Sequence, residues 1–300
     1  MDFLIFQVPM LTLQATLDGV LLGILFALIA YGMALQWGVM NIINIAQGDL
    51  VILGGYIAYF MYLWGIHPAW GVIVSPFIMY FVGVGIYKLV INKVVDRDLF
   101  ISILATFGIS LILQQTVRSV FSPLNRQVIS PSWLSGSLEI NPVFSLTYNR
   151  LYILAFAIIV LLCLQLVLKK TKLGLQVRAV SQNRAMARSM GVRTERVDAL
   201  TFGLGAGVAG VAGVALSQLT NVGPNLGQAY IVDSFMVVVF GGVGNLWGTM
   251  VGGFTLGIAN KFLEPMTGPV LANIFVLIFI ILFIQKRPSG LFPQRGRATE

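Results

Sequence analysis

Charge is the scarcest property of this sequence. Charged residues make up 10% of its 300 residues, whereas 57% of the residues are hydrophobic. A soluble domain carries about 25% charged residues, so this chain has too few of them to cover a surface that faces water. A hydrocarbon environment needs no such cover. We therefore expect an integral membrane protein whose residues 1–300 form a single transmembrane domain.

Several chemical groups needed for catalysis or cofactor binding are also missing. The chain has one cysteine, Cys163, and one histidine, His67, which excludes a disulfide framework and an imidazole–thiolate metal cluster. It has no Gly-Lys-Ser/Thr, so it lacks the phosphate-binding loop of ATPases. A G-x-G-x-x-G pattern at 205–210 is embedded in an apolar run, where small residues favour close helix packing. We expect no catalytic residue, no metal site and no bound cofactor.

Long apolar runs are what the sequence has instead. About 20 apolar residues cross the hydrocarbon core of a bilayer as a helix. Nine runs approach or exceed this length: 10–36, 49–64, 68–91, 100–121, 150–168, 197–219, 230–243, 246–262 and 270–284. Some are short enough to be broken or re-entrant. The predicted fold is an all-α, polytopic membrane helix bundle with about eight or nine transmembrane segments.

The distribution of Lys and Arg predicts the orientation, because cytoplasmic loops retain positive charge. The loop 169–196 holds eight basic residues and a single acid, Glu195, and the tail 285–300 is also basic. The long loop 122–149, in contrast, contains only one basic residue. We therefore place 122–149 outside and 169–196 and 285–300 in the cytoplasm, with the N-terminus outside and the C-terminus inside.

The basic loop 169–196 contains a short predicted helix at 182–191. Arg184 and Arg188 are four residues apart, so they share one face, and Met186 and Met190 supply an apolar stripe. Three roles remain open for this segment: a positive-inside anchor, a patch for anionic lipid, or a docking helix for a cytoplasmic protein. The length of the loop and its apolar stripe favour the protein partner.

Two segments combine glycine with polar residues at predicted membrane depth, at 41–55 and 241–253. Irregular backbone is tolerated in a bilayer only where protein or a wet cavity receives it, and a buried carboxylate is costly there. The candidate residues of a translocation path are Asn44, Gln47, Asp49 and Asn245. They line the path near the midplane, or both segments are tight cytoplasmic turns in which Asp49 caps a helix.

Three segments resemble the branched-chain amino-acid permease family of ABC transporters: NIINIAQGDL at 41–50, LGLQVRAV at 173–180 and VFGGVGNLWG at 239–248. AMARSMG at 185–191 is similar to the coupling-loop signature of bacterial ABC importer permeases. Ala187 and Gly191 match that signature, whereas Ala185 and Met186 replace its acid and first alanine. The downstream proline of the signature is absent.

Within that family, five further segments look most like the permease subunit of urea transporters: NRQV at 125–128, LSQLTNVGPNLG at 216–227, DSFMVVVF at 233–240, ANKFLEP at 259–265 and IQKRPSGLF at 284–292. The resemblance implies an importer for urea in the bacterial inner membrane. The alternative is a branched-chain amino-acid importer, and a passive channel fits less well. Urea is neutral and planar, so Asn, Gln and Asp side chains suit it.

The resemblance also implies the partners. They are a second homologous permease subunit, two cytoplasmic ATPase subunits that use ATP, and a periplasmic or extracellular substrate-binding protein. Membrane lipid surrounds the chain, and no nucleic acid is expected. The ATPase-coupling residues implied in this way are Arg184, Ala185, Ala187, Arg188 and Gly191.

Overall fold

The computed structural model describes residues 9–129, 136–141 and 144–292. Over these residues the chain forms eleven α-helices, two short 3-10 helices and one β-hairpin. The helices that coincide with the predicted apolar runs are α2 (Pro9–Met40), α3 (Gln47–Leu63), α4 (Gly71–Leu89), α5 (Leu99–Phe121), α6 (Tyr148–Lys170), α9 (Thr194–Ser217), α10 (Leu226–Gly241), α11 (Leu246–Thr267) and α12 (Pro269–Lys286). The prediction of an all-helical polytopic bundle is confirmed.

The helices differ in how completely they could cross a bilayer. Six candidate spans in the described part of the chain are long and apolar enough to do so, in α2, α4 with its preceding turn, α5, α6, α9 and α12. The helix α10 is apolar but shorter, and α3 has only 17 residues. The helix α11 is long but carries Lys261 and Glu264, which form an ion pair. The helices α3, α10 and α11 are therefore not among the six candidate spans, although each coincides with a predicted apolar run.

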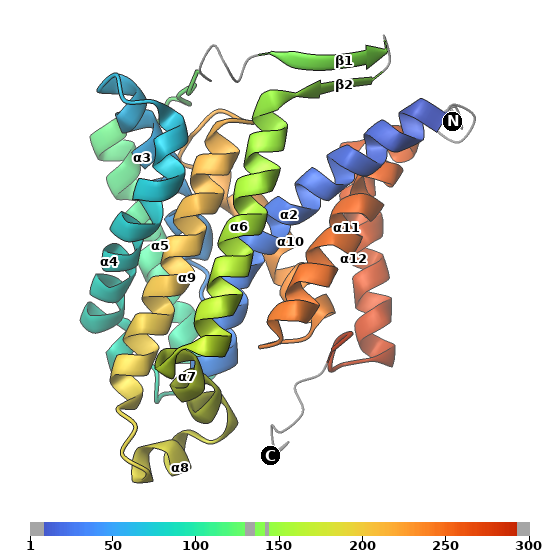
Figure 1. The fold of residues 1–300 in the computed structure, drawn as a ribbon. Coiled ribbons are helices and arrows are strands. Elements are labelled where there is room, and N and C mark those ends of the chain that lie inside the picture. Colours follow the sequence, from blue (N-terminus) through green and yellow to red (C-terminus); the bar gives the residue numbers. More distant parts are fainter. Residues whose placement is uncertain (1–8, 130–135, 142–143, 293–300) are drawn as a thin grey trace.

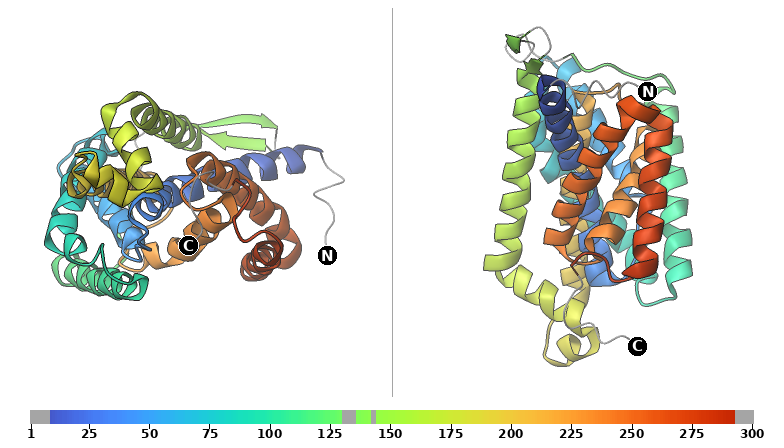
Figure 2. Two further views of the ribbon diagram at one scale, coloured as in Figure 1. Left: turned by 90° about the horizontal axis from the view of Figure 1, so that it is seen from below. Right: turned by 90° about the vertical axis from the view of Figure 1, so that its right-hand side faces the viewer.

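The two ends of the bundle carry different structures (Figure 1). One end holds the start of α2 and the hairpin of β1 (Ser137–Asn141) and β2 (Phe144–Thr147), which pair antiparallel within the loop 122–149. The opposite end holds α7 (Lys172–Gln182), α8 (Arg184–Ser189) and the end of α12, as the side view of Figure 2 also shows. Residues 130–135 and 142–143 of the loop and 293–300 of the tail lie outside the described residues.

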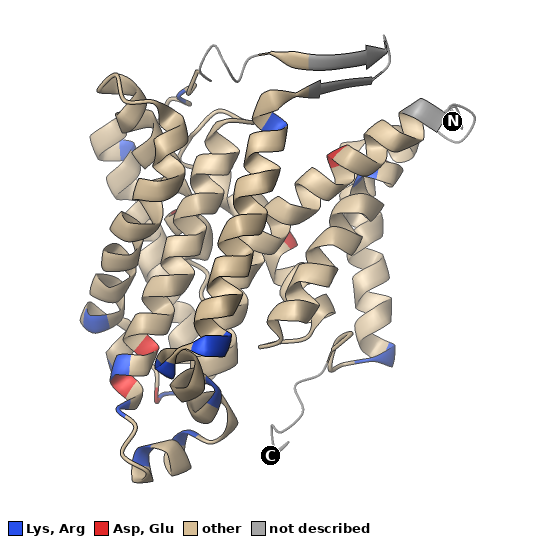
Figure 3. Cartoon of the chain, viewed as in Figure 1, with Lys and Arg blue, Asp and Glu red and all other residues tan. Residues whose placement is uncertain are grey.

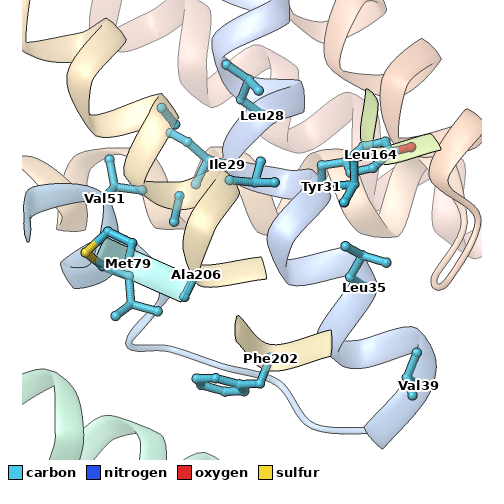
Figure 4. Packing of buried hydrophobic residues seen from close by; sticks show 14 of the residues in the cluster. Leu28, Ile29, Tyr31, Leu35, Val39, Val51, Met79, Leu164, Phe202 and Ala206 are labelled. Carbon is cyan, nitrogen blue, oxygen red and sulfur yellow. The ribbon is translucent and has the colours of Figure 1, made fainter. Parts of the chain in front are cut away.

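The helix α9 lies at the centre of the bundle and packs against α2, α3 and α4. Its small residues allow this, because a Cβ atom at Gly213 would lie 1.9 Å from the carbonyl oxygen of Val51. The G-x-G-x-x-G pattern at 205–210 is therefore part of a continuous, buried packing helix. Phe202 and Ala206 of α9 belong to the same buried cluster as Met79 and Val51 (Figure 4).

The short helices begin and end where the sequence supplies capping or turn residues. The side chain of Thr171 accepts a hydrogen bond from the backbone N–H of Gly174 at the start of α7, and Asn183 accepts one from Met186 at the start of α8. Gly191 follows α8 with a φ of 84°, a left-handed conformation that glycine adopts without a steric penalty. These signals separate α7, α8 and α9 and so position the segment predicted to couple to the ATPases.

Candidate functional site

Charged residues gather at the end of the bundle that carries α7 and α8 (Figure 3). Arg184 opens α8 and turns toward the bundle, where its guanidinium meets the carboxylate of Asp198 in the first turns of α9. Its Nη1 donates to Asp198 Oδ1 at 3.2 Å, and its Nη2 donates to Oδ2. The Asp198 side chain is fully buried. The hydroxyl of Tyr87 on α4 donates to the same carboxylate at 3.4 Å.

Arg188, one turn further along α8, contacts a second acid. Its Nη2 donates to Asp96 Oδ2 at 3.0 Å, and its Nε donates to Thr194 Oγ1 at 2.9 Å. Asp96 lies in the link between α4 and α5, and Arg184 Nε is 3.3 Å from its Oδ1. The hydrogen bond from Arg188, assisted by the charge of both arginines, holds the pKa of Asp96 below its usual range.

We call Arg184, Arg188, Asp96, Asp198 and Tyr87 the arginine cluster. It joins α8 to α4, to the α4–α5 link and to α9. Removing one partner of a buried ion pair leaves an uncompensated charge, which costs far more than the intact pair contributes. The cluster therefore fixes the position of α8 relative to α9, the central helix of the bundle.

The exposed face of α8 is its apolar one. The two arginines, which helical spacing places on one basic face, point at the bundle, although Arg188 remains 47% exposed. The outward side chains are apolar: Met186 is 62% exposed and Met190 is 79% exposed. Ala185 is also exposed, whereas Ala187 is buried beneath the helix. Helical spacing placed the two arginines on one face but could not say which way that face turns.

The first polar break connects α2 to α3 and lies inside the bundle. Asn44 is fully buried, and its Nδ2 donates to Gln36 Oε1 at 2.8 Å while its Oδ1 accepts from the backbone N–H of Ala46 at 3.0 Å. Gln47 Nε2 donates to the carbonyl of Gly205 at 3.3 Å. These two predicted path residues therefore hold the irregular backbone between α2, α3 and α9.

Asp49 lies in the first turn of α3 and is 4% exposed. Its Oδ1 accepts from Gln114 Nε2 of α5 at 3.0 Å, and Gln114 Oε1 accepts from Gln228 Nε2 of α10 at 3.3 Å. No side chain caps the start of α3, so the alternative that Asp49 is a helix cap does not apply. We call Asp49, Gln114 and Gln228 the amide chain. It runs from the buried Asp49 to the exposed Gln228.

The second polar break, between α10 and α11, is a tight turn. The Oδ1 of Asn245 accepts from the backbone N–H groups of Trp247 and Gly248, at 3.1 and 3.2 Å, and so caps α11. Its Nδ2 donates to the carbonyl of Phe292 at 3.1 Å, which ties the turn to the segment after α12. Asn44, Gln47 and Asp49 share one region of the bundle, whereas the hydrogen bonds of Asn245 go to its own turn and to Phe292.

Sequence reasoning missed Gln114, Gln228, Asp96, Asp198 and Tyr87. One signal was available for Asp198, because it is the only acid inside the apolar run 197–219 and follows directly after the basic loop. The pairing of Gln114 with Asp49 joins residues 65 positions apart, and no local pattern reports such a contact. Within the described residues, no group of three or more His, Cys, Asp or Glu side chains is arranged to hold a metal ion.

Comparison with known proteins covers nearly the whole chain. Residues 15–284 match the family model described as "Branched-chain amino acid transport system / permease component". The high-affinity branched-chain amino acid transport system permease proteins LivH of Escherichia coli K12 and of Salmonella typhimurium LT2 are each 30% identical to this chain. In each case the match covers 93% of this chain and 94% of the relative.

More distant matches extend the comparison. The protein BraD of Pseudomonas aeruginosa, of the same description, is 27% identical over 93% of this chain and 95% of its own length. The ribose import permease RbsC of Escherichia coli K12 is 29% identical over 35% of each chain. Among solved structures, PsaBC from Streptococcus pneumoniae in complex with Fab aligns over 93% of this chain and 92% of its own, with a TM-score of 0.44 and 14% identity.

Proposed function

Because this chain belongs to the branched-chain amino-acid permease family of ABC importers, we propose that it forms part of the path by which urea crosses the membrane. As a member of that family it is a multi-pass permease of the bacterial inner membrane, it is not an enzyme, and partner ATPase subunits hydrolyse the ATP. The observation that carries the urea assignment is the amide chain, which brings two glutamines and one carboxylate together from α3, α5 and α10.

Urea is a small, neutral, planar molecule with one acceptor oxygen and four N–H donors. The amide chain offers both complements. Gln228 keeps one N–H donor and its carbonyl oxygen, while the two N–H donors of Gln114 are used by Asp49 and Ser110 and its oxygen keeps one further acceptor position. Asp49 adds an acceptor without a neighbouring cation to neutralise it. A buried polar site favours a solute that satisfies all of its donors and acceptors, since each unpaired buried group costs about 1–3 kcal/mol.

Branched-chain amino acids are the second candidate, and the relatives favour them. The full-length relatives are named as branched-chain amino acid permeases. A free amino acid needs a site for an ammonium group and one for a carboxylate. Asp49 supplies an anion, and Arg118 lies one helical turn beyond Gln114 on α5, where its Nη2 donates to Asn225 Oδ1 at 2.8 Å. An amino acid therefore requires the charges of Asp49 and Arg118, whereas urea requires only hydrogen-bonding groups.

The proposed machine has further subunits, as its family implies. A second homologous permease completes the path, two ATPase subunits bind at α8, and a periplasmic or extracellular binding protein delivers the solute. In this arrangement the end with the hairpin is external, and the end with α7 and α8 is cytoplasmic. The exposed Met186 and Met190 form the docking surface. The arginine cluster transmits movement of α8 to α9.

Uptake of radiolabelled urea and radiolabelled leucine, in cells with and without the gene, tests this function. We expect deletion to abolish high-affinity urea uptake and to leave leucine uptake unchanged. Deleting the genes of the partner ATPases must have the same effect, because a passive channel would keep urea uptake without them. Loss of leucine uptake alone overturns the urea assignment in favour of the second candidate.

A further inference from the structure

A cavity of about 290 Å³ lies at the end of the bundle that carries α7 and α8. It is formed by α2, α6, α7 and the start of α11, and it contains no member of the arginine cluster or of the amide chain. Its size is close to the lower end of the range for small-molecule sites, about 300 Å³. The cavity is therefore a separate feature of the molecule that the transport function leaves unexplained.

The rim of this cavity is positively charged. Lys169, in the last turn of α6, and Arg178 of α7 both line it, and no Asp or Glu does. Lys169 Nζ lies 5.2 Å from the centre of the Trp247 ring. Arg178 Nη1 donates to the carbonyl of Leu168 at 2.7 Å, which uses one of the five N–H donors of its guanidinium. Neither cation forms an ion pair with any acid in the part of the chain that the structure describes.

A buried donor lies one helical turn deeper. Gln165 of α6 lines the cavity and is 7% exposed. Its amide interacts with the hydroxyl of Tyr31, but outside the geometry of a normal hydrogen bond. The amide has two N–H donors, and buried side-chain donors in proteins nearly always have a partner. Gln165 can therefore donate to an acceptor that enters the cavity.

Three kinds of group line the cavity. They are the cations Lys169 and Arg178, the amide of Gln165 one turn before Lys169 on α6, and apolar side chains such as Ala34, Leu35 and Leu246. A glycerophospholipid carries the complementary groups: an anionic phosphate, ester carbonyls that accept hydrogen bonds, and acyl chains. Basic pockets between transmembrane helices bind anionic headgroups, and Trp residues gather at the membrane–water interface.

We propose that this cavity binds an anionic glycerophospholipid of the phosphatidylglycerol class. Lys169 and Arg178 hold its phosphate, and Gln165 donates to an ester carbonyl. The apolar wall distinguishes this ligand from a free phosphate ion, which has no group to place against Leu35 or Leu246. This proposal is independent of whether the transported solute is urea or an amino acid.

Native mass spectrometry of the full chain, purified with its partner subunits and stripped of lipid, tests the proposal. The added probes are phosphatidylglycerol, phosphatidylcholine, glycerol 1-phosphate and inorganic phosphate. We expect phosphatidylglycerol to bind at least ten times more tightly than phosphatidylcholine. Phosphatidylcholine binding equally well contradicts the proposal, and so does inorganic phosphate or glycerol phosphate displacing the lipid at similar concentrations, because both results remove the need for an anionic lipid.

Matched variants assign the binding to this cavity. We expect Lys169→Gln and Gln165→Leu each to weaken phosphatidylglycerol binding about tenfold. Lys170→Gln is the control, since Lys170 is exposed on the next position of α6 and does not line the cavity. Arg178→Gln also removes the hydrogen bond to the carbonyl of Leu168 and could fail to fold for that reason. The test therefore relies on Lys169→Gln, which leaves this hydrogen bond intact. Equal lipid binding by Lys169→Gln and Lys170→Gln overturns the assignment.

Discussion

Asp198 shows how one buried side chain can organise a membrane protein at its interface with water. Its carboxylate is fully buried and accepts hydrogen bonds from Arg184 and Tyr87, so α4, α8 and α9 meet at one residue. Such a pair is held together because either partner alone would be a buried, unsolvated charge. The ion pair stabilises one position of α8 relative to α9.

The change Asp198→Asn tests this positional role. It keeps the shape of the side chain but leaves the guanidinium of Arg184 without its counter-charge. We expect a loss of stability of about 3–5 kcal/mol, the range for breaking a buried ion pair. Thermal unfolding of the purified protein measures it. Glu195→Gln is the control, since Glu195 is exposed and forms no ion pair within the described residues; equal melting temperatures for the two variants would contradict the role of Asp198.

The charge of Asp49 separates the two candidate solutes. Asp49→Asn keeps an oxygen that accepts from Gln114 but removes the negative charge, whereas Asp49→Leu removes the acceptor as well. For urea we expect Asn to retain most transport and Leu to lose about tenfold to a hundredfold, since hydrogen bonds to charged groups contribute about 1.5–3 kcal/mol. Initial rates of labelled urea uptake give the comparison. A complete loss of urea uptake in Asp49→Asn contradicts this account, because it shows that the negative charge and not the hydrogen-bond acceptor is required.

At the scale of the elements, much of the fold could be predicted from the sequence. Each of the nine apolar runs coincides with a helix, because a helix buried in lipid needs only length and hydrophobicity, and both are local properties. Gly191 and Asn183 mark the limits of α8 for a similar reason. The orientation of α8 could not be predicted, since it depends on Asp96 and Asp198, which reach it from other segments.

The candidate site was predictable only in part, for the same physical reason. The segment 41–55 stood out because polar residues and glycine are rare at membrane depth. The partners Gln114 and Gln228 did not stand out, because their contacts are set by how α5 and α10 pack beside α3. Asn245 was grouped with the path by composition, whereas its hydrogen bonds show the geometry of a helix cap.

The turn after α8 gives a test of the coupling segment. Gly191 has a φ of 84° and open space around the position of a Cβ atom, so a substitution there meets backbone strain and no clash. Asn tolerates this conformation, but a β-branched residue does not. We expect Gly191→Asn to retain most ATP-driven uptake and Gly191→Val to lose most of it while still inserting into the membrane. The measurement is the uptake rate divided by the amount of protein inserted in the membrane. An unchanged rate in Gly191→Val contradicts the coupling role.

The exposed methionines of α8 test its docking surface. Met186→Glu together with Met190→Glu places charges on the outward face without touching the arginine cluster. We expect the purified chain to keep its melting temperature but to lose co-purification with the ATPase subunits. The paired change to Leu is the control, because it keeps the face apolar. If the Glu variant still co-purifies fully and remains coupled, the ATPases bind elsewhere.

At the scale of the whole molecule, the placement of charge implies an orientation. Basic residues concentrate around α7 and α8, while the opposite end carries the hairpin and the start of α2 (Figure 3). In a background with Cys163→Ser, we expect Ser189→Cys on α8 to react with a membrane-impermeant maleimide only after the membrane is opened. Ser137→Cys on β1 must react in intact spheroplasts. The reverse pattern contradicts the assignment of the N-terminus to the outside and the C-terminus to the cytoplasm.

The whole assembly provides the most direct test of the central claim, that this permease carries urea under the control of partner ATPases. The measurement is uptake of labelled urea and labelled leucine into proteoliposomes that contain the chain with its second permease and both ATPases, with binding protein added on the accessible side. We expect urea to accumulate only when ATP is hydrolysed, and leucine to stay at the background level. ATP-dependent accumulation of leucine without urea, or urea entry without ATP, would contradict the account.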